Sequence, residues 1–318
     1  MTTILTGVDD DPAARDAVVL ARALAGENGA ELLAAAVQVE PRVPLPRSLR
    51  PAGPSREELE RIVAAVCADC APHARTVTVK ERSAAHALRD LAEREQARLV
   101  VLGSSRHAPD GEAFAGRTVR QVLHEAPCAV ALAARGLAGG VAAAPADAAS
   151  APGAAAAPAA SAFTLRRIVV GTDGSPESVA AVAAARALAE TSGAALHVVA
   201  VADEQLAVRR APLGEVLELA EWDELVARRR QHAEQALAAA LDAAGEEAGG
   251  EVLVGDPPEQ LAAAAAGADL LVVGSRHWGA RSRVVIGSTS EELLRGAPCS
   301  LLLVPRPHDE ADATAAQA

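Results

Sequence analysis

The chain is built from two copies of one sequence pattern, and this repeat constrains its fold more than any other feature. Ile4–Asp9 (ILTGVD) matches Ile168–Asp173 (IVVGTD), 164 positions later. Near the end of each copy, Ala126–Cys128 (APC) matches Ala297–Cys299, 171 positions later. The larger offset requires an insertion of seven residues in the middle of the second copy. Two ends in register around one insertion indicate a duplicated domain.

Within each copy, short runs of Val, Ile and Leu alternate with Ala-, Leu- and Glu-rich stretches typical of helices. In the second copy we expect strands near 167–172, 195–201, 250–254, 269–273 and 299–304. Helices are expected near 176–191, 215–244, 257–266 and 288–296. Continuous apolar strands separated by helices predict an α/β fold, in which helices cover both faces of a parallel sheet.

A change in composition sets the expected domain limits. Residues 136–162 are almost entirely Ala, Gly and Pro, and three prolines interrupt any helix there. We therefore expect a first domain over 1–135, a flexible linker over 136–163, a second domain over 164–307 and a disordered tail over 308–318.

Charge and composition exclude several classes of partner. The chain has 30 Lys and Arg against 42 Asp and Glu, and an excess of 12 negative charges repels nucleic-acid phosphates. With two Phe, two Trp and no Tyr, it lacks platforms for base stacking. No apolar run approaches the ~20 residues that cross a bilayer, and the N-terminus lacks a signal-peptide pattern. We predict a cytoplasmic protein that binds neither nucleic acid nor membranes.

Polar and glycine-rich residues follow two strands of the second copy. Thr172 and Asp173 close the first predicted strand, and Gly274 follows the fourth, which is expected to end at Val273. Ligands of open parallel sheets bind at the carboxyl ends of the strands, where the strand order reverses. Gly287–Ser290 opens a predicted helix whose free amides favour an anion. The pattern predicts a site with a carboxylate for a ribose diol and amides for phosphate.

These motifs resemble the universal stress protein family, in a tandem two-domain form. A strand-end Asp, a Gly-x-x-Gly-x9-Gly-Ser loop and a closing Ala-Pro-Cys strand carry the resemblance, which covers the chain outside the linker and tails. It implies two flavodoxin- or Rossmann-like domains, each a five-stranded parallel sheet in the order 3-2-1-4-5. It also implies a stress-response protein that binds ATP or another adenine nucleotide, with or without Mg²⁺. The residues implied to contact the nucleotide are Thr172, Asp173, Val201, Val273, Gly274, Gly287, Ser288 and Thr289.

Both copies depart from the family motif. His277 stands at the position of the second glycine, where its imidazole either obstructs a phosphate or contacts it, so His277 joins the candidate binding residues. In the first copy, Asp10-Asp11 replaces the Gly-Ser pair after Asp9. Arg106 and Arg117 replace a glycine and a serine of the same motif. We expect weak nucleotide binding in the first copy, or none, with Asp11 capping the following helix.

Two classes of function remain open. One is an adenine-nucleotide-binding protein with its main site in the second copy, and the alternative is a scaffold that acts through protein–protein contacts. We expect no enzyme, because the sequence has no Ser-His-Asp order, metal-ligand spacing or Walker lysine, although slow hydrolysis of a bound nucleotide stays open.

The cysteines and the last strands complete the predictions. Cys67 and Cys70 have redox spacing, but they end a helical stretch, so we interpret the spacing as incidental. Cys128 and Cys299 are expected to be small buried residues. The resemblance implies that the apolar last strands, near 129–132 and 300–304, pair the two domains within one chain; the sequence leaves further homodimerisation open.

Overall fold

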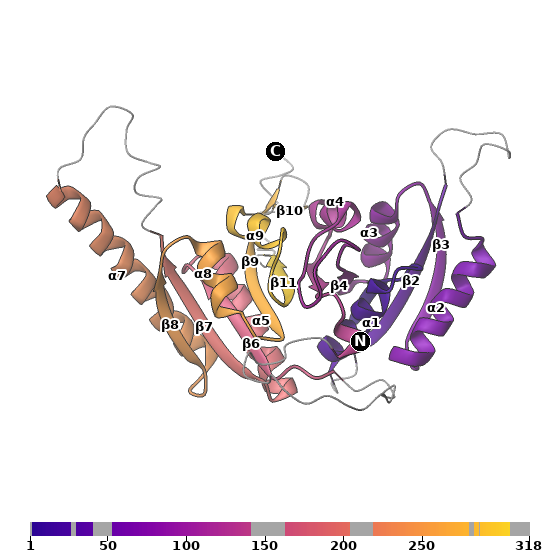
Figure 1. Ribbon diagram of the computed structural model, residues 1–318, viewed down its shortest axis with the longest axis horizontal. Helices are drawn as coiled ribbons and strands as arrows, with labels where there is room; N and C mark the ends of the chain where they lie inside the picture. Colours follow the sequence, from indigo (N-terminus) through magenta and orange to yellow (C-terminus); the bar gives the residue numbers. More distant parts are fainter. Residues whose placement is uncertain are drawn as a thin grey trace.

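The computed structural model shows two α/β halves joined edge to edge (Figure 1). It describes residues 2–26, 30–40, 53–140, 163–203, 219–279, 283–285 and 287–305. Among these residues, no helix has both the length and the apolar character needed to cross a membrane.

The N-terminal half alternates strands and helices along the chain. Its elements are β1 (Thr3–Gly7), α1 (Ala13–Ala25), β2 (Glu31–Val39), α2 (Arg56–Cys70), β3 (Arg75–Glu81), α3 (Ala84–Arg94), β4 (Ala97–Gly103), α4 (Arg117–Glu125), β5 (Ala129–Ala133) and the 3₁₀ turn η2 (Leu137–Gly139). The strands are all parallel and lie in the order β3-β2-β1-β4-β5. The strand order therefore reverses between β1 and β4.

The C-terminal half repeats this arrangement. Its elements are β6 (Arg167–Thr172), α5 (Pro176–Ser192), β7 (Ala195–Ala202), α7 (Leu219–Ala244), β8 (Gly249–Val254), α8 (Pro257–Ala264), β9 (Leu270–Gly279), β10 (Arg283–Val285), α9 (Ser288–Leu293) and β11 (Ser300–Pro305). The order β8-β7-β6-β9-β11 is the same 3-2-1-4-5 order, with its reversal between β6 and β9. The predicted fold class is confirmed.

One predicted boundary is wrong. We expected the fourth strand of the second copy to end at Val273 and a loop to follow it. Instead β9 continues to Gly279, and β10 turns back along it as an antiparallel partner, with Trp278 opposite Val284. Aromatic and β-branched side chains favour such extended pairing. The glycine-containing segment after Val273 therefore begins as one arm of a hairpin.

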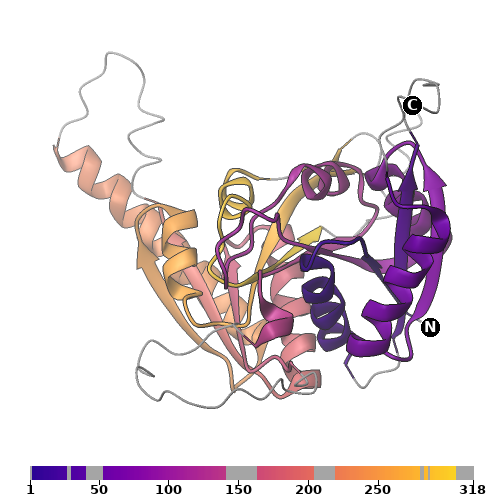
Figure 2. The same cartoon turned by 45° about the vertical axis from the view of Figure 1, so that its right-hand side comes forward.

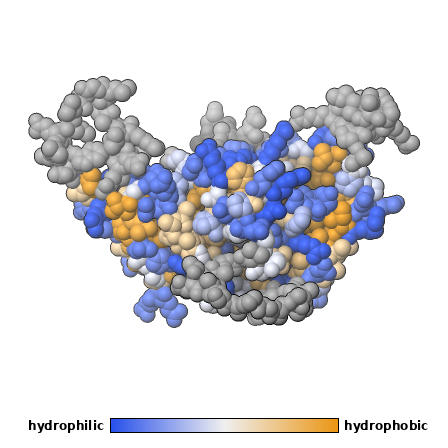
Figure 3. All heavy atoms as spheres, viewed as in Figure 1, coloured by the Kyte–Doolittle hydropathy of each residue, from blue (hydrophilic) through white to orange (hydrophobic). Residues whose placement is uncertain are grey.

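The two sheets are continuous with each other. β11 lies antiparallel to β5, with Leu301 opposite Leu132 and Leu303 opposite Val130. Helices cover both faces of the combined sheet, and Figures 1 and 2 show α7 reaching beyond its edge. Two large clusters of mostly Ala, Val and Leu side chains form most of the core, one on each face. Figure 3 shows polar side chains over much of one outer face, with apolar groups between them.

All four cysteines are free and buried, so we expect their thiols to react slowly with reagents in solution. Burial raises the pKa of Cys128 and Cys299 to about 12, and it also raises the pKa of Cys67 and Cys70. The thiolate is the reactive form, so we expect the native protein to react with Ellman's reagent far more slowly than the urea-unfolded chain. Rapid labelling of two thiols in the native protein would instead identify Cys67 and Cys70 as a reactive pair.

Candidate functional site

A tight turn presents Asp173 at the carboxyl end of β6. Gly174 has a φ of +76°, a conformation that favours glycine. Oδ1 of Asp173 accepts hydrogen bonds from the amide of Ser175 at 3.0 Å and from its hydroxyl at 2.5 Å. Ser175 also caps α5, since its Oγ accepts the amide of Ser178 at 3.3 Å. The helix cap and the carboxylate are thus held by one residue, while Asp173 itself stays exposed to solvent.

The equivalent carboxylates of the two halves have different electrostatic surroundings. Partial burial acts to raise the pKa of Asp173, but the hydrogen bonds from Ser175 outweigh it and hold this pKa below the ordinary value of 3.8. The pKa of Asp9 lies above that value, because partial burial and the negative charges of Asp11 and Asp10 outweigh a backbone hydrogen bond. The second half therefore stabilises its carboxylate anion, whereas the first half opposes ionisation of Asp9.

These opposite shifts can be measured by following carboxyl carbons in an NMR pH titration. We expect Asp173 to titrate below Asp9, Ser175→Ala to raise the pKa of Asp173, and Asp10→Asn to lower that of Asp9. Because the folded pKa of Asp173 is lowered, its anion stabilises the fold above about pH 4, and this contribution disappears as the pH falls further. Equal pKa values for the two carboxyls would contradict the assignment.

Gly274 has a packing role in addition to its predicted ligand role. A Cβ at this position would lie 2.8 Å from the backbone carbonyl of Glu177 and 3.0 Å from the amide of Ser178. Glycine is therefore needed for β9 to pass the start of α5. The first half repeats this constraint, because a Cβ at Gly103 would lie 2.2 Å from the carbonyl oxygen of Ala13.

A hydrogen bond brings the start of α9 to the same end of the sheet. The hydroxyl of Ser290 donates to the carbonyl oxygen of Gly274 at 3.0 Å. Gly287 immediately precedes α9, and no side-chain hydrogen bond caps the helix there. Ser288 is exposed and Thr289 is half-buried. The predicted residues on β6, β9 and α9 therefore gather at one reversal point.

The remaining predicted residues occupy the neighbouring strands. Thr172 is buried at the end of β6, where its Oγ1 lies 3.3 Å from the Oγ of Ser178. Val201 lies half-buried on β7. Val273 is buried among the core residues of one sheet face, so its backbone is the part left for a ligand. His277 lies on β9 within the hairpin, and its side chain is outside the described residues.

Two residues beside the site were not predicted from the sequence. Nε2 of His232, on α7, lies 3.2 Å from the carbonyl oxygen of Asp173. Ser275 follows Gly274 on β9, and its buried hydroxyl has no hydrogen-bond partner in the described part of the chain. Its equivalent in the first half, Ser104, donates to the carbonyl oxygen of Ala133 at 2.6 Å. A buried polar group without a partner is uncommon and is often satisfied by water or a ligand.

The N-terminal half has an open cleft at its own reversal point. The cleft has a volume of about 690 Å³, within the usual ~300–1,000 Å³ range of small-molecule pockets. Asp9, Gly103, Arg106 and Thr118 are among the residues that line it. The structure thus adds a cavity to a half that we expected to bind weakly or not at all.

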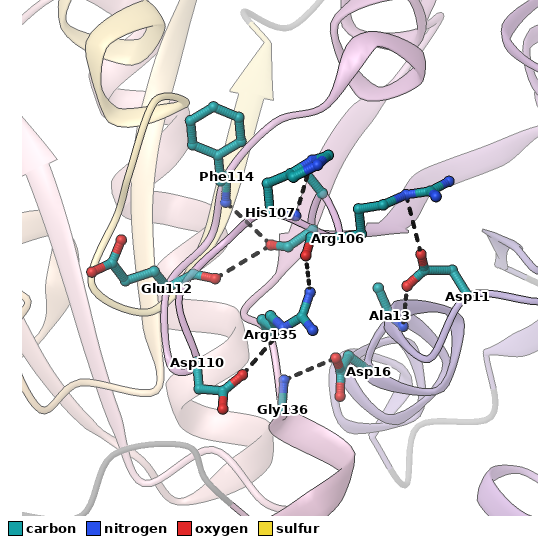
Figure 4. Close-up of polar contacts among 12 residues, drawn as sticks. Asp11, Ala13, Asp16, Arg106, His107, Asp110, Glu112, Phe114, Arg135 and Gly136 are labelled. Atoms are coloured by element: carbon teal, nitrogen blue, oxygen red, sulfur yellow. Dashed lines mark hydrogen bonds and ion pairs between the residues drawn. The ribbon is translucent and has the colours of Figure 1, made fainter.

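Charged side chains already interact with one another in this cleft. Oδ2 of Asp11 lies 3.9 Å from Nε of Arg106, and Figure 4 shows the two side chains facing each other. Oδ1 of Asp11 accepts the amide of Ala13 at 3.0 Å, so Asp11 caps the start of α1 as expected. Asp9 and Asp10 place two further carboxylates beside them. A triphosphate would therefore meet negative charge in this half.

Comparison with known proteins identifies the family. The sequence profile described as the universal stress protein family matches residues 1–133 and 164–305, which together make up most of the chain. The chain belongs to the universal stress protein family. A universal stress protein from Thermus aquaticus is 34% identical over 142 residues, which cover 44% of this chain and 98% of that protein.

Solved structures show the same fold over the whole length. A protein of unknown function from Pseudomonas aeruginosa superposes with a TM-score of 0.59 at 16% identity, covering 100% of this chain and 96% of its own. A universal stress protein from Archaeoglobus fulgidus gives a TM-score of 0.55 at 14% identity, with coverage of 96% and 98%. Solved proteins of similar length thus share this α/β fold.

Proposed function

We propose that this universal stress protein binds ATP or a related adenine nucleotide, mainly in its C-terminal half. The observation that carries the proposal is the anionic Asp173 carboxylate, which Ser175 holds at the end of β6, the strand that pairs with β9. The turn after Asp173 has the small neutral pair Gly174-Ser175, where the first half has Asp10-Asp11. Less negative charge therefore opposes a phosphate in the second half.

Each part of a nucleotide has a proposed contact. Asp173 accepts hydrogen bonds from the two ribose hydroxyls, and the backbone at Val201 and Val273 meets the adenine. The phosphates lie against Thr172 and the amides and hydroxyls of Gly287–Thr289, with His277 and Gly274 beside them. Because α9 has only six residues, direct hydrogen bonds rather than a helix dipole hold the phosphates. Mg²⁺ accompanies the nucleotide where the phosphates need further neutralisation.

The domain organisation is part of the same proposal. The proposed domains span residues 1–135 and 164–307, with η2 packed against α1 of the first, and they act as a pair inside one chain through β5 and β11. The proposed role is binding or sensing rather than catalysis. The Ser175 hydroxyl donates to the carboxylate of Asp173, but the same oxygen also caps α5, which is a structural role.

Isothermal titration calorimetry of the full chain tests the proposal. We expect saturable binding of ATP with a stoichiometry near one per chain. Binding of cAMP should be weaker, because its 3′ oxygen is part of the cyclic phosphate and the ribose diol is lost. Binding of GTP should likewise be weaker than that of ATP, because GTP lacks the adenine that the proposed backbone contacts recognise. A stoichiometry of two would add the N-terminal cleft, and no binding of any nucleotide would leave the scaffold alternative.

A further inference from the structure

The interface between the halves pairs equivalent positions of the repeat around a local twofold axis. Ala131 of β5 lies opposite Leu302 of β11, and these residues are 171 positions apart, the offset of the repeat. The flanking pairs, Val130 with Leu303 and Leu132 with Leu301, exchange equivalent positions across this axis. A pairing of two identical halves in this geometry would place each axial residue against its own copy.

Equivalent positions of the two helices α4 and α9 carry opposite charges that meet across the interface. Arg120 of α4 forms an ion pair with Glu291 of α9, and these positions are also 171 residues apart. Both side chains are about one-third exposed. In a pairing of like halves, Arg120 would meet a second Arg120, and Glu291 would meet a second Glu291. Close like charges are unfavourable.

A buried hydrogen bond is similarly one-sided. The hydroxyl of Ser300 accepts the amide of Ala134 at 3.2 Å, and both residues are buried. The equivalent positions are Ala129, which has no hydroxyl, and Pro305, which has no amide hydrogen. Pairing two C-terminal halves would leave Ser300 facing Pro305. Pairing two N-terminal halves would leave the Ala134 amide facing Ala129, without a partner.

Side-chain size differs at the axis in the same complementary way. Ala131 and Leu302 are both buried in the core cluster that α1 and α5 cover. A small residue thus faces a large one. Two alanines would leave unfilled volume in this packed layer, and two leucines would exceed it.

We propose that this interface selects unlike halves and rejects like ones. Opposite charge, a one-sided hydrogen bond and a small-to-large contact each favour the pairing of β5 with β11. The partner that fits each edge strand is therefore the other half, either in the same chain or in a second copy that exchanges halves. The repeat has diverged at its axis into a heterotypic pair.

Exchanging the two charges in the full chain tests the contribution of the Arg120–Glu291 ion pair. Arg120→Glu and Glu291→Arg each create a like-charge pair, and each should lower the melting temperature by about 3 °C. The double variant Arg120→Glu/Glu291→Arg restores an opposite pair and should recover most of this loss. A double variant that shows the sum of the two single losses would overturn the role of this ion pair.

The preference for unlike halves is tested by measuring how many chains associate in solution. Arg120→Glu/Ala131→Leu gives the N-terminal half the axial residues of the C-terminal half, so the charge and size preferences disappear. Light scattering across a concentration series should then show more particles of two or more chains than wild type shows. The charge-exchanged variant, which retains its preference, should match wild type. If all three proteins have the same mass distribution while folded by circular dichroism, the proposal is overturned.

Discussion

Replacing Asp173 by alanine is expected to weaken ATP binding at least about tenfold. A hydrogen bond to a charged group contributes about 1.5–3 kcal/mol, and a carboxylate that holds a ribose diol accepts two. The loss should appear in calorimetry as a higher dissociation constant at unchanged stoichiometry. The 2′-deoxy analogue of ATP should lose affinity for the wild type and much less for Asp173→Ala, because the variant has already lost that contact.

The repeat supplies a matched control inside the same chain. Asp9→Ala removes the equivalent carboxylate of the N-terminal half and should leave ATP affinity unchanged. The reverse outcome, in which Asp9→Ala weakens binding and Asp173→Ala does not, would move the site to the N-terminal cleft.

The second large effect concerns the stability of the fold. A Cβ at Gly103 would lie 2.2 Å from the carbonyl oxygen of Ala13 and 2.7 Å from its carbonyl carbon. These are backbone atoms, so β4 and α1 must move apart to accept even a methyl group. We expect Gly103→Ala to lower the free energy of unfolding in urea by about 2–4 kcal/mol.

Gly116→Ala is the control for this prediction. Gly116 belongs to the same motif, but a Cβ there would be 3.5 Å from its nearest neighbour, Ser105, at an ordinary φ of −72°. The expected change in unfolding free energy is within about 0.5 kcal/mol. Equal losses for the two variants would contradict the packing role of Gly103.

The glycine motif could be interpreted only in part from the sequence, because its glycines differ in what surrounds them. Gly103 and Gly274 occupy equivalent positions, and both allow a strand end to pass close to a helix start. A motif that marks a ligand loop therefore also marks a packing contact. The spacing located the reversal point correctly because the packing requirement is set by the fold.

The architecture could be predicted because the repeat and the alternation of apolar strands with helices act over long segments. The hairpin of β9 and β10 could not, because Arg276–Gly279 mixes polar and aromatic residues without a clear strand pattern. His232 was also missed as a neighbour of the site. It is 59 positions from Asp173 and reaches it only through the packing of α7. The cleft of the N-terminal half was also missed. It is formed by the strand order of the backbone, whereas the prediction for this half was based on side chains that depart from the family motif.

A crystal structure determined with saturating ATP tests the central claim most directly. The account predicts one nucleotide in the C-terminal half, with its ribose hydroxyls on the carboxylate of Asp173 and its phosphates against the amides at Gly287–Thr289. An unoccupied C-terminal site in which the imidazole of His277 fills the phosphate position would contradict it.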